Sequence, residues 1–255
     1  MARSATERVP AQQSLLRRVV GGVREMVLIV VIALVIATLI KTFLAQMFVI
    51  PSQSMENTLQ RSDRVLVVKA VGYQRGDIVV FEDRLNWLPP APEANAVQRA
   101  LEFVGVLPAS GDQYLIKRLI GLPGDRVVCC DVQGRITVNG FALDESSYLY
   151  RKPDGTSVKP SEMPFDVVVP AGRIFVLGDH RNASADSRYH FCDTVGATAK
   201  GDNAFPFVVS IQGPAKVLAY PFDRAATFAA PATFAGVPDP VPAPDPPPLP
   251  QGGGC

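Results

Sequence analysis

The sequence lacks a charge excess of either sign, and it is poor in cysteine and histidine. Its 255 residues include 25 lysines and arginines and 24 aspartates and glutamates, which leaves a net charge of +1. Because there is also no strongly basic stripe, we expect no nucleic-acid partner. No cysteine belongs to a C-x-x-C pair, so we expect no metal site. The histidines are only His180 and His190, which limits the choice of a histidine base.

What the sequence does have is one long apolar segment near its start. From Met26 to Ala45 the only charged residue is Lys41. A helix of about 20 apolar residues spans a bilayer, so we expect one transmembrane helix and a lipid partner. The residues before it carry five arginines against two glutamates: Arg3, Arg8, Arg17, Arg18, Arg24, Glu7 and Glu25. This excess predicts a cytoplasmic N-terminus and an extracytoplasmic location for everything after about residue 46.

Two other interpretations of the apolar segment are less favoured. A cleavable secretory signal has an apolar region of about 7–15 residues and a small-residue cleavage motif. Here the segment is longer and no clean motif ends it. The arginine-rich flank also argues against a buried core helix. We therefore predict an uncleaved anchor in the cytoplasmic membrane.

The rest of the chain predicts a mainly β fold. Short β-branched runs separated by Gly, Pro and Asp are typical of antiparallel strands. We expect strands at 48–50, 64–69, 77–81, 114–120, 126–130, 135–138, 166–169, 174–177, 207–211 and 215–219. We predict four segments: a cytoplasmic N-terminal segment at 1–23, a membrane anchor at 24–46, a β-rich extracytoplasmic domain at 47–224 and a disordered Pro/Ala-rich tail at 225–255. The domain has an insertion at about 85–111, which contains a helix at 93–104.

An extracytoplasmic domain permits a disulfide bond. We expect Cys192 to pair with either Cys129 or Cys130, and the sequence does not choose between them. A bond between the two adjacent cysteines is disfavoured, because its geometry distorts the backbone.

Two segments suggest hydrolytic chemistry close to the membrane. Ser54 lies in a serine-rich loop, residues 51–59, that follows an apolar stretch running from Met26 to Ile50. Lys117 lies within an apolar strand and shares its face with Leu115 and Leu119. Desolvation lowers the pKa of an amine, and a neutral amine can act as a general base. The alternative is that Lys117 reaches solvent past a short edge strand, and a histidine base is not excluded.

Four successive motifs make the chain resemble the bacterial type I signal peptidases, which are membrane-anchored serine proteases with a Ser/Lys dyad. They lie at 48–59, 64–69, 114–125 and 178–188, and include Pro-Ser-x-Ser-Met, Ile-Lys-Arg with Gly-Leu-Pro-Gly-Asp, Gly-Asp-x-Arg and Ser-x-Asp-Ser-Arg. The resemblance implies the antiparallel β-sheet catalytic domain of that family. It implies that Ser54 is the nucleophile and Lys117 the general base, with no metal or cofactor.

The resemblance also implies roles for six supporting positions. Ser52, with the Ser54 backbone N–H, would line the oxyanion hole, and Ser184 would orient the lysine amine. Asp186 and Arg188 would form a supporting pair. By position, Ile50 and Ile116 would wall shallow pockets for alanine-sized side chains, although core packing explains them equally well. The substrate would be an exported preprotein that pairs with strand edges near its signal-peptide cleavage site.

The chain departs from the family pattern at two places near the site. Asn57 stands where a proline is common, and His180-Arg181-Asn182-Ala183 replaces the more usual Asn-Arg-Asp-Asn. Two other functions stay open from the sequence. One is a self-cleaving Ser/Lys protease, and the other is a non-enzymatic anchored β-domain, in which Ser54 and Lys117 would lie far apart.

Overall fold

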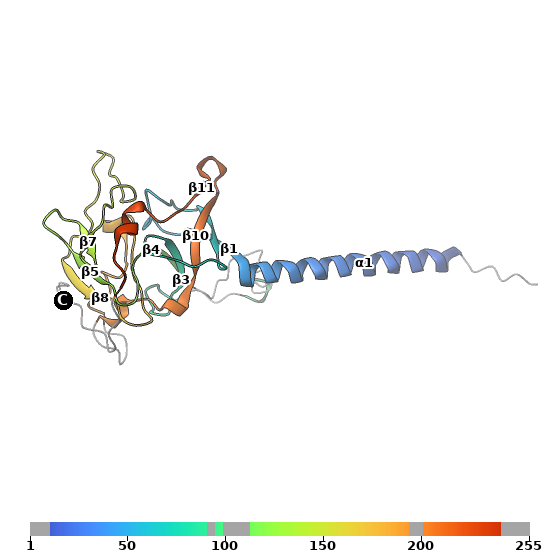
Figure 1. Cartoon of the computed structure of the whole chain (residues 1–255). Coiled ribbons are helices and arrows are strands. Elements are labelled where there is room, and N and C mark those ends of the chain that lie inside the picture. The colour runs from blue at the N-terminus through green and yellow to red at the C-terminus, as the bar shows by residue number, and fades with distance from the viewer. Residues whose placement is uncertain (1–10, 91–94, 99–112, 194–200, 241–255) are drawn as a thin grey trace, which may run out of the picture.

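The protein consists of a long N-terminal helix followed by a β-domain, as Figure 1 shows. The computed structural model describes residues 11–90, 95–98, 113–193 and 201–240. Within these residues the β-domain contains a seven-stranded and a four-stranded antiparallel sheet. The fold class predicted from the sequence, mainly antiparallel β with one N-terminal apolar helix, is therefore confirmed.

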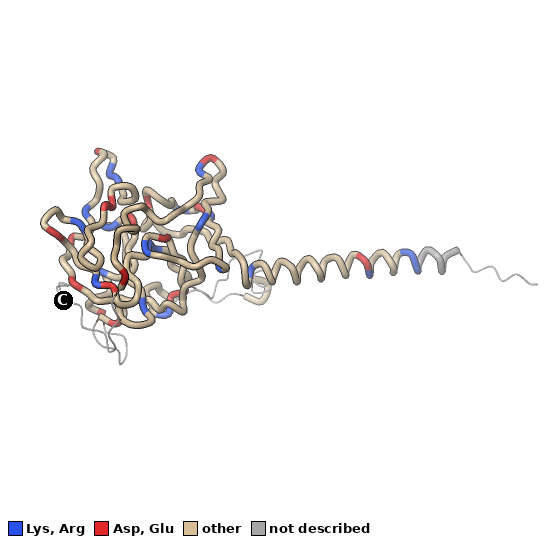
Figure 2. The backbone as a smooth tube through the Cα atoms, viewed as in Figure 1, with Lys and Arg blue, Asp and Glu red and all other residues tan. Residues whose placement is uncertain are grey.

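Helix α1 (Ala11–Leu39) continues into a π-helical segment, Ile40–Leu44. An 18-residue window within Arg17–Leu44 has a mean hydropathy of 2.8, and none of that window is buried. Figure 2 shows charges at the far end of this helix and then a long uncharged stretch, which ends at Lys41, four residues before β1. An exposed helix that is apolar all round is what a lipid environment requires.

The helix begins earlier than the sequence predicted. We predicted the anchor at 24–46 and no helix before it, but residues 11–23 are already helical. Once a helix has formed, each further residue adds one hydrogen bond, so good helix formers extend it even past Gly21 and Gly22. At its other end the helical segment leads directly into the first strand, since β1 begins at Ala45.

The larger sheet has the order β1-β2-β10-β3-β4-β9, with β11 paired to β10. Its strands are β1 (Ala45–Val49), β2 (Arg64–Val68), β3 (Ile78–Glu82), β4 (Tyr114–Gly121), β9 (Phe175–Leu177), β10 (Ile211–Tyr220) and β11 (Ala226–Thr227). One core cluster joins β1, β2, β3, β4 and β10 to Met55 and Leu59, which lie just after Ser54. This cluster fixes the predicted nucleophile segment against the sheet.

The smaller sheet has the order β7-β6-β5-β8. Its strands are β5 (Arg126–Cys129), β6 (Ile136–Val138), β7 (Phe141–Ala142) and β8 (Phe165–Val168). A phenylalanine-rich core cluster packs this sheet against β9 and includes Phe165, Phe175, Phe191 and Phe205. Most predicted strands agree with these bounds to within about two residues. The exceptions are the predicted strands 207–211 and 215–219, which give way to the single strand β10, and β1, which begins earlier than predicted.

The expectation of a disordered tail from residue 225 is wrong for the described residues up to 240. Strand β11 pairs with β10, and residues Ala232–Gly236 form a short 3-10 helix. Phe234 and Val237 are 6% and 8% exposed and belong to the phenylalanine-rich cluster. The segment folds because these apolar side chains find a preformed core, although its proline-rich composition shows no periodic pattern. Residues 241–255 lie outside the described residues.

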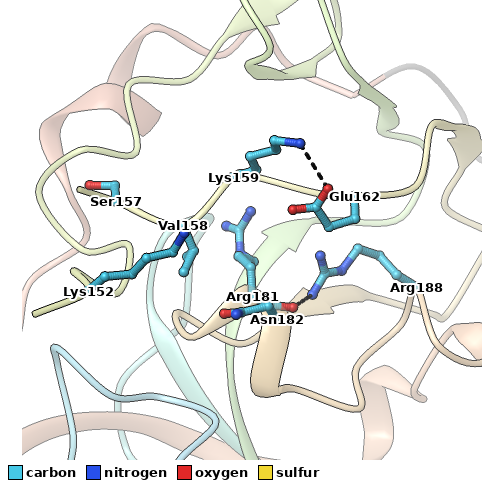
Figure 3. Close-up of a pocket in the computed structure, with 8 residues that line it drawn as sticks. All are labelled: Lys152, Ser157, Val158, Lys159, Glu162, Arg181, Asn182 and Arg188. Atoms are coloured by element: carbon cyan, nitrogen blue, oxygen red, sulfur yellow. Dashed lines mark hydrogen bonds and ion pairs between the residues drawn. The ribbon is translucent and has the colours of Figure 1, made fainter. Parts of the chain in front are cut away.

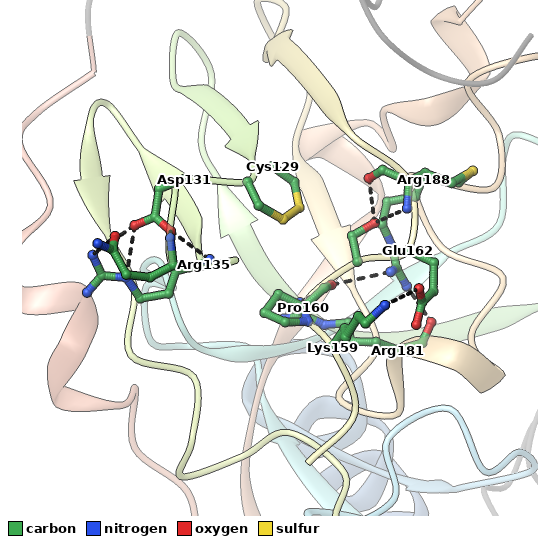
Figure 4. The surroundings of a disulfide bond; sticks show 12 residues. Cys129, Asp131, Arg135, Lys159, Pro160, Glu162, Arg181 and Arg188 are labelled. Carbon is green, nitrogen blue, oxygen red and sulfur yellow. Dashed lines mark hydrogen bonds and ion pairs between the residues drawn. A yellow bond between two sulfur atoms is a disulfide. The ribbon is translucent and has the colours of Figure 1, made fainter. Parts of the chain in front are cut away.

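The disulfide also differs from the prediction. Cys129 is bonded to Cys130, so neither pairs with Cys192. The peptide bond between the two cysteines is cis, and their Cα atoms lie 2.9 Å apart. Figure 4 shows this disulfide near the Asp131–Arg135 ion pair and the segment around Pro160. The helix predicted at 93–104 lies mostly outside the described residues. The part of it that the structure describes is 95–98, in which 96–98 are helical.

Candidate active site

A tight turn after β1 carries Ser54. The N–H of Glu56 donates to the Gln53 carbonyl at 3.0 Å, and the N–H of Leu59 donates to the Met55 carbonyl at 2.7 Å. Met55 and Leu59 are completely buried, which fixes both ends of the turn in the core. Ser54 is itself only 4% exposed. The position of its hydroxyl is therefore set by packing on the side chains that follow it.

Strand β4 brings Lys117 to Ser54. Lys117 Nζ lies 2.6 Å from Ser54 Oγ, a hydrogen-bond distance between residues 63 positions apart in the sequence. Lys117 is 3% exposed, and its cross-strand partner Val79 is completely buried. Val79 and Leu119 share one apolar cluster, against which Leu115 packs. The structure thus excludes the alternative in which Lys117 reaches solvent past an edge strand.

Burial lowers the pKa of Lys117 from 10.5 to about 8. The Asp186 carboxylate is the largest influence in the opposite direction, because a nearby negative charge favours the ammonium form. The Arg188 guanidinium lowers the pKa further. An amine of this kind is partly neutral near neutral pH, as a general base must be.

Ser52 lies on the same turn, with its Oγ 3.1 Å from Ser54 Oγ. A hydroxyl at this position can donate to an oxyanion that forms on the carbon attacked by Ser54. Among the described residues, no backbone carbonyl accepts the Ser54 N–H. Both donors predicted for the oxyanion hole are therefore adjacent to the serine hydroxyl.

The segment 178–188 forms the third side of the site. A Cβ on Gly178 would lie 2.3 Å from Ser184 Oγ and 2.5 Å from the Ser54 carbonyl oxygen, so only glycine allows this approach. The Asp186 carboxylate accepts the Gly178 N–H at 3.0 Å and binds Arg188 through two hydrogen bonds. The predicted Asp186–Arg188 pair is thus present and buried, and it holds Gly178 against the serine.

Ser184 differs from its prediction. Its Oγ is buried but has no hydrogen-bond partner among the described residues, so the expected contact with Lys117 is not made. Ser54 Oγ instead lies at hydrogen-bond distance from the lysine amine. Ile50 and Ile116 are 2% and 6% exposed and lie in one apolar cluster with Met55. Their packing beside the serine segment fits either a core or a pocket role.

Sequence reasoning missed a buried ionic network behind the dyad. Asp179 binds Arg118 through two hydrogen bonds of 2.6 and 2.8 Å and accepts the Thr58 hydroxyl at 2.5 Å. This carboxylate therefore connects the serine segment, the lysine strand and the 178–188 segment. An arginine next to Lys117 inside an apolar strand was a signal that a buried acidic partner was needed.

A second missed pair is Arg181 with Glu145, both nearly inaccessible to solvent. Arg181 also donates to the carbonyls of Gly178 and Pro160. Figure 3 shows Arg181 and Arg188 beside a cavity of about 220 Å³, with the exposed Lys159–Glu162 pair nearby. Since their guanidinium groups are already bonded to protein acceptors, these arginines brace the segment that carries Ser184.

The two histidines lie apart from the dyad contact. His180 Nδ1 binds Glu56, and His190 Nδ1 binds Asp193. No hydrogen bond joins either ring to Ser54 within the described part of the chain. In the described part of the chain there is also no group of three or more histidine, cysteine, aspartate or glutamate side chains that could hold a metal ion.

Comparison with known proteins identifies the family. Residues 23–204 match the family described as signal peptidase, peptidase S26. The chain is 34% identical to signal peptidase I of Mycobacterium tuberculosis strain H37Rv, over 84% of this chain and 76% of that protein. It is 35% identical to the probable signal peptidase I of Mycobacterium leprae, over 78% of this chain and 77% of that protein. A solved structure of a signal peptidase I from Enterococcus faecalis V583 matches with a TM-score of 0.31 and 25% identity. The match covers 56% of this chain and 97% of that one. The chain belongs to the signal peptidase family, peptidase S26.

Proposed function

We propose that this member of the family removes signal peptides from exported preproteins, with Ser54 as nucleophile and Lys117 as general base. The observation that carries the proposal is the 2.6 Å contact between the serine hydroxyl and a buried amine whose pKa is about 8. A non-enzymatic β-domain predicts that these groups lie far apart, so the contact disfavours that alternative.

The geometry supports a mechanism in two halves. Neutral Lys117 takes the hydroxyl proton while Ser54 Oγ attacks the scissile carbonyl carbon. The Ser54 N–H and the Ser52 hydroxyl stabilise the oxyanion, which contributes a factor of about 10²–10³ in rate for each such donor. The ammonium of Lys117 then protonates the leaving amine as the C–N bond breaks. In the second half, Lys117 deprotonates a water whose oxygen attacks the acyl carbon, and the lysine ammonium then protonates Ser54 Oγ as the ester C–O bond breaks.

The open half of β4 supports an extended peptide as substrate. Strand β9 pairs only with the 118–121 half of β4, whereas β3 pairs with residues 114–118 on the other side. Opposite β3, residues 115–117 of β4 pair with no strand among the described residues. An added peptide strand would hydrogen-bond this edge and bring its scissile bond to Ser54. Ile50 and Ile116 would then limit the flanking side chains to small ones.

The N-terminal helix supports a location in the cytoplasmic membrane. Its apolar stretch is long enough to cross the hydrocarbon core, and arginines precede it. We propose a single-pass anchor with the N-terminus in the cytoplasm and the β-domain outside. Protease added outside intact cells should then digest the β-domain, and resistance until the cells are lysed would reverse this orientation.

The decisive experiment is cleavage of a preprotein by the Ser54→Ala and Lys117→Ala variants. Each should lose cleavage, while Ser157→Ala and Lys159→Ala, which change the same residue types at exposed positions, should keep it. Retained cleavage by either active-site variant removes that residue from the mechanism. Stoichiometric self-cleavage, with no turnover of preproteins, would favour the self-cleaving alternative.

A further inference from the structure

His180, one of the departures from the family pattern, connects two segments of the candidate site. Its backbone N–H donates to the Ser54 carbonyl at 3.0 Å. Its ring Nδ1 lies 3.0 Å from Glu56 Oε2. One residue of the 178–188 segment therefore binds the serine turn at the nucleophile itself and again two positions further along.

The chemistry of the second contact fixes the role of the ring. A carboxylate oxygen accepts hydrogen bonds, so the tautomer that fits this contact has its N–H at Nδ1, which donates to Glu56. That nitrogen cannot serve as a base while it is bound in this way. The amine at hydrogen-bond distance from Ser54 belongs to Lys117, which leaves His180 as a residue that holds the turn.

Tyr150 holds the ring in this orientation. The centroids of the two rings lie 3.7 Å apart with an interplanar angle of 22°, a stacked arrangement. The Tyr150 N–H donates to the Asp179 carbonyl at 3.0 Å, so the stacking partner is bonded to the residue next to His180. With the His180 side chain only 11% exposed, the ring has little freedom to leave Glu56.

Asn57, the second departure, has a backbone angle that a proline cannot adopt. Asn57 follows Glu56 and has a φ of 82°, in the left-handed region. A proline, common in the family at this position, cannot adopt this angle, because its ring fixes φ near −65°. The backbone of the serine turn is therefore not restricted by a proline ring at position 57. The hydrogen bond between His180 and Glu56 restrains the turn instead.

We propose that His180 is a positioning residue that, through Glu56 and the Ser54 carbonyl, holds the Ser54 hydroxyl and N–H in their reactive orientation. This inference rests on the proposed function, since it concerns the same nucleophile. Small displacements of reacting groups cost about 10²-fold in rate, so loss of the contact should reduce the rate of the chemical step.

The test compares His180→Ala, Glu56→Ala and the double variant, made in the full-length protein and assayed with a peptide that spans a signal-peptide cleavage site. Each single variant should lower kcat about 10- to 100-fold and change KM less than about threefold. The double variant should be no worse than the poorer single one, because both remove the same contact. Glu56→Gln should recover most of the activity, since its amide oxygen still accepts from Nδ1.

The pH profile separates positioning from a merely structural or basic role. In every variant the midpoint of the rise in kcat/KM should stay at about 8, because Lys117 sets it. Glu162→Ala removes an exposed ion pair of the same 3.0 Å length and should leave kcat unchanged. Glu56 is partly exposed, so its variants keep the test valid even if His180→Ala fails to fold.

Three outcomes overturn the proposal: kcat within twofold of wild type in the single variants, losses that multiply in the double variant, or a rise in KM with kcat intact. If Ser54→Ala also cleaves the peptide, the proposed function itself fails. If Ser54→Ala is inactive while the Glu56 and His180 variants are normal, only the positioning role fails.

Discussion

The burial of Lys117 predicts how cleavage depends on pH. An amine with a pKa of about 8 is about half neutral at pH 8, whereas one at the ordinary 10.5 is about 0.3% neutral. Burial therefore increases the population of the active base by a factor of about 150. Because the base must be unprotonated, kcat/KM should fall about tenfold for each pH unit below about 8 and level off above it.

The assay measures initial cleavage rates of a peptide without ionisable side chains, between about pH 6 and pH 10. Asp186→Asn provides a second perturbation. The Asp186 carboxylate raises the pKa of Lys117, so its removal should move the midpoint below that of the wild type. Asp166→Asn is the matched control, because this carboxylate pairs with Arg126 at the surface and should leave the midpoint unchanged.

Four results would refute this reasoning. A midpoint near about 6.5 would assign the base to a histidine, and one near about 10.5 would mean that the amine is not desolvated. A profile that is flat from about pH 6 to pH 9 would mean that no amine titrates in the rate-limiting step. A midpoint that moves equally in the Asp166→Asn control would attribute the shift to general charge.

Four further changes test the site and the fold. Lys117→Met should abolish cleavage yet raise the unfolding free energy at pH 7 by on the order of 3 kcal/mol in denaturant titrations. The reason is that the folded pKa of about 8 lies below the unfolded 10.5, so wild-type stability increases only as pH rises through that interval. Ser52→Ala should lower kcat by about 10²–10³ with KM little changed, and equal kcat would exclude it from the oxyanion hole. Ser184→Ala removes a buried, unpartnered hydroxyl and should leave the thermal midpoint unchanged or higher, whereas a lower midpoint would show an overlooked partner. Phe234→Ala should lower the free energy of unfolding by about 3–5 kcal/mol in denaturant titrations, and a loss near zero would mean that this segment does not pack on the core.

The strands were largely predictable because each is a short β-branched run whose ends coincide with Gly, Pro or Asp. Strand β10 shows where this reasoning stops. Gly213 and Pro214 look like a break between two strands, yet they pair with β3 inside one continuous strand. A Cβ on Gly213 would lie 2.7 Å from the Val68 carbonyl oxygen, so the glycine marks a close approach between strands. Sequence alone does not distinguish a turn from such an approach.

The contact between Ser54 and Lys117 was predictable mainly from the resemblance to the signal peptidases, because the alternation around Lys117 alone also allowed the amine to reach solvent. The network behind them was not. Asp179 and Arg118 are 61 positions apart, and only the folded sheet shows that they meet. The contact expected for Ser184 was also not found, since a motif identifies which residues gather at a site but not which donor each acceptor takes.

The absence of a linker between the anchor and β1 makes the junction a rigid coupling. The pairing of β1 with β2 fixes its register, so a residue inserted between Leu44 and Ala45 could be absorbed only on the helix side. Such an insertion would turn the membrane helix by about 100° and displace it by about 1.5 Å relative to the protease domain. The distance between the membrane and the bond that is cut is thus set by the direct connection of the helix to β1. An engineered flexible spacer at this junction would let that distance vary.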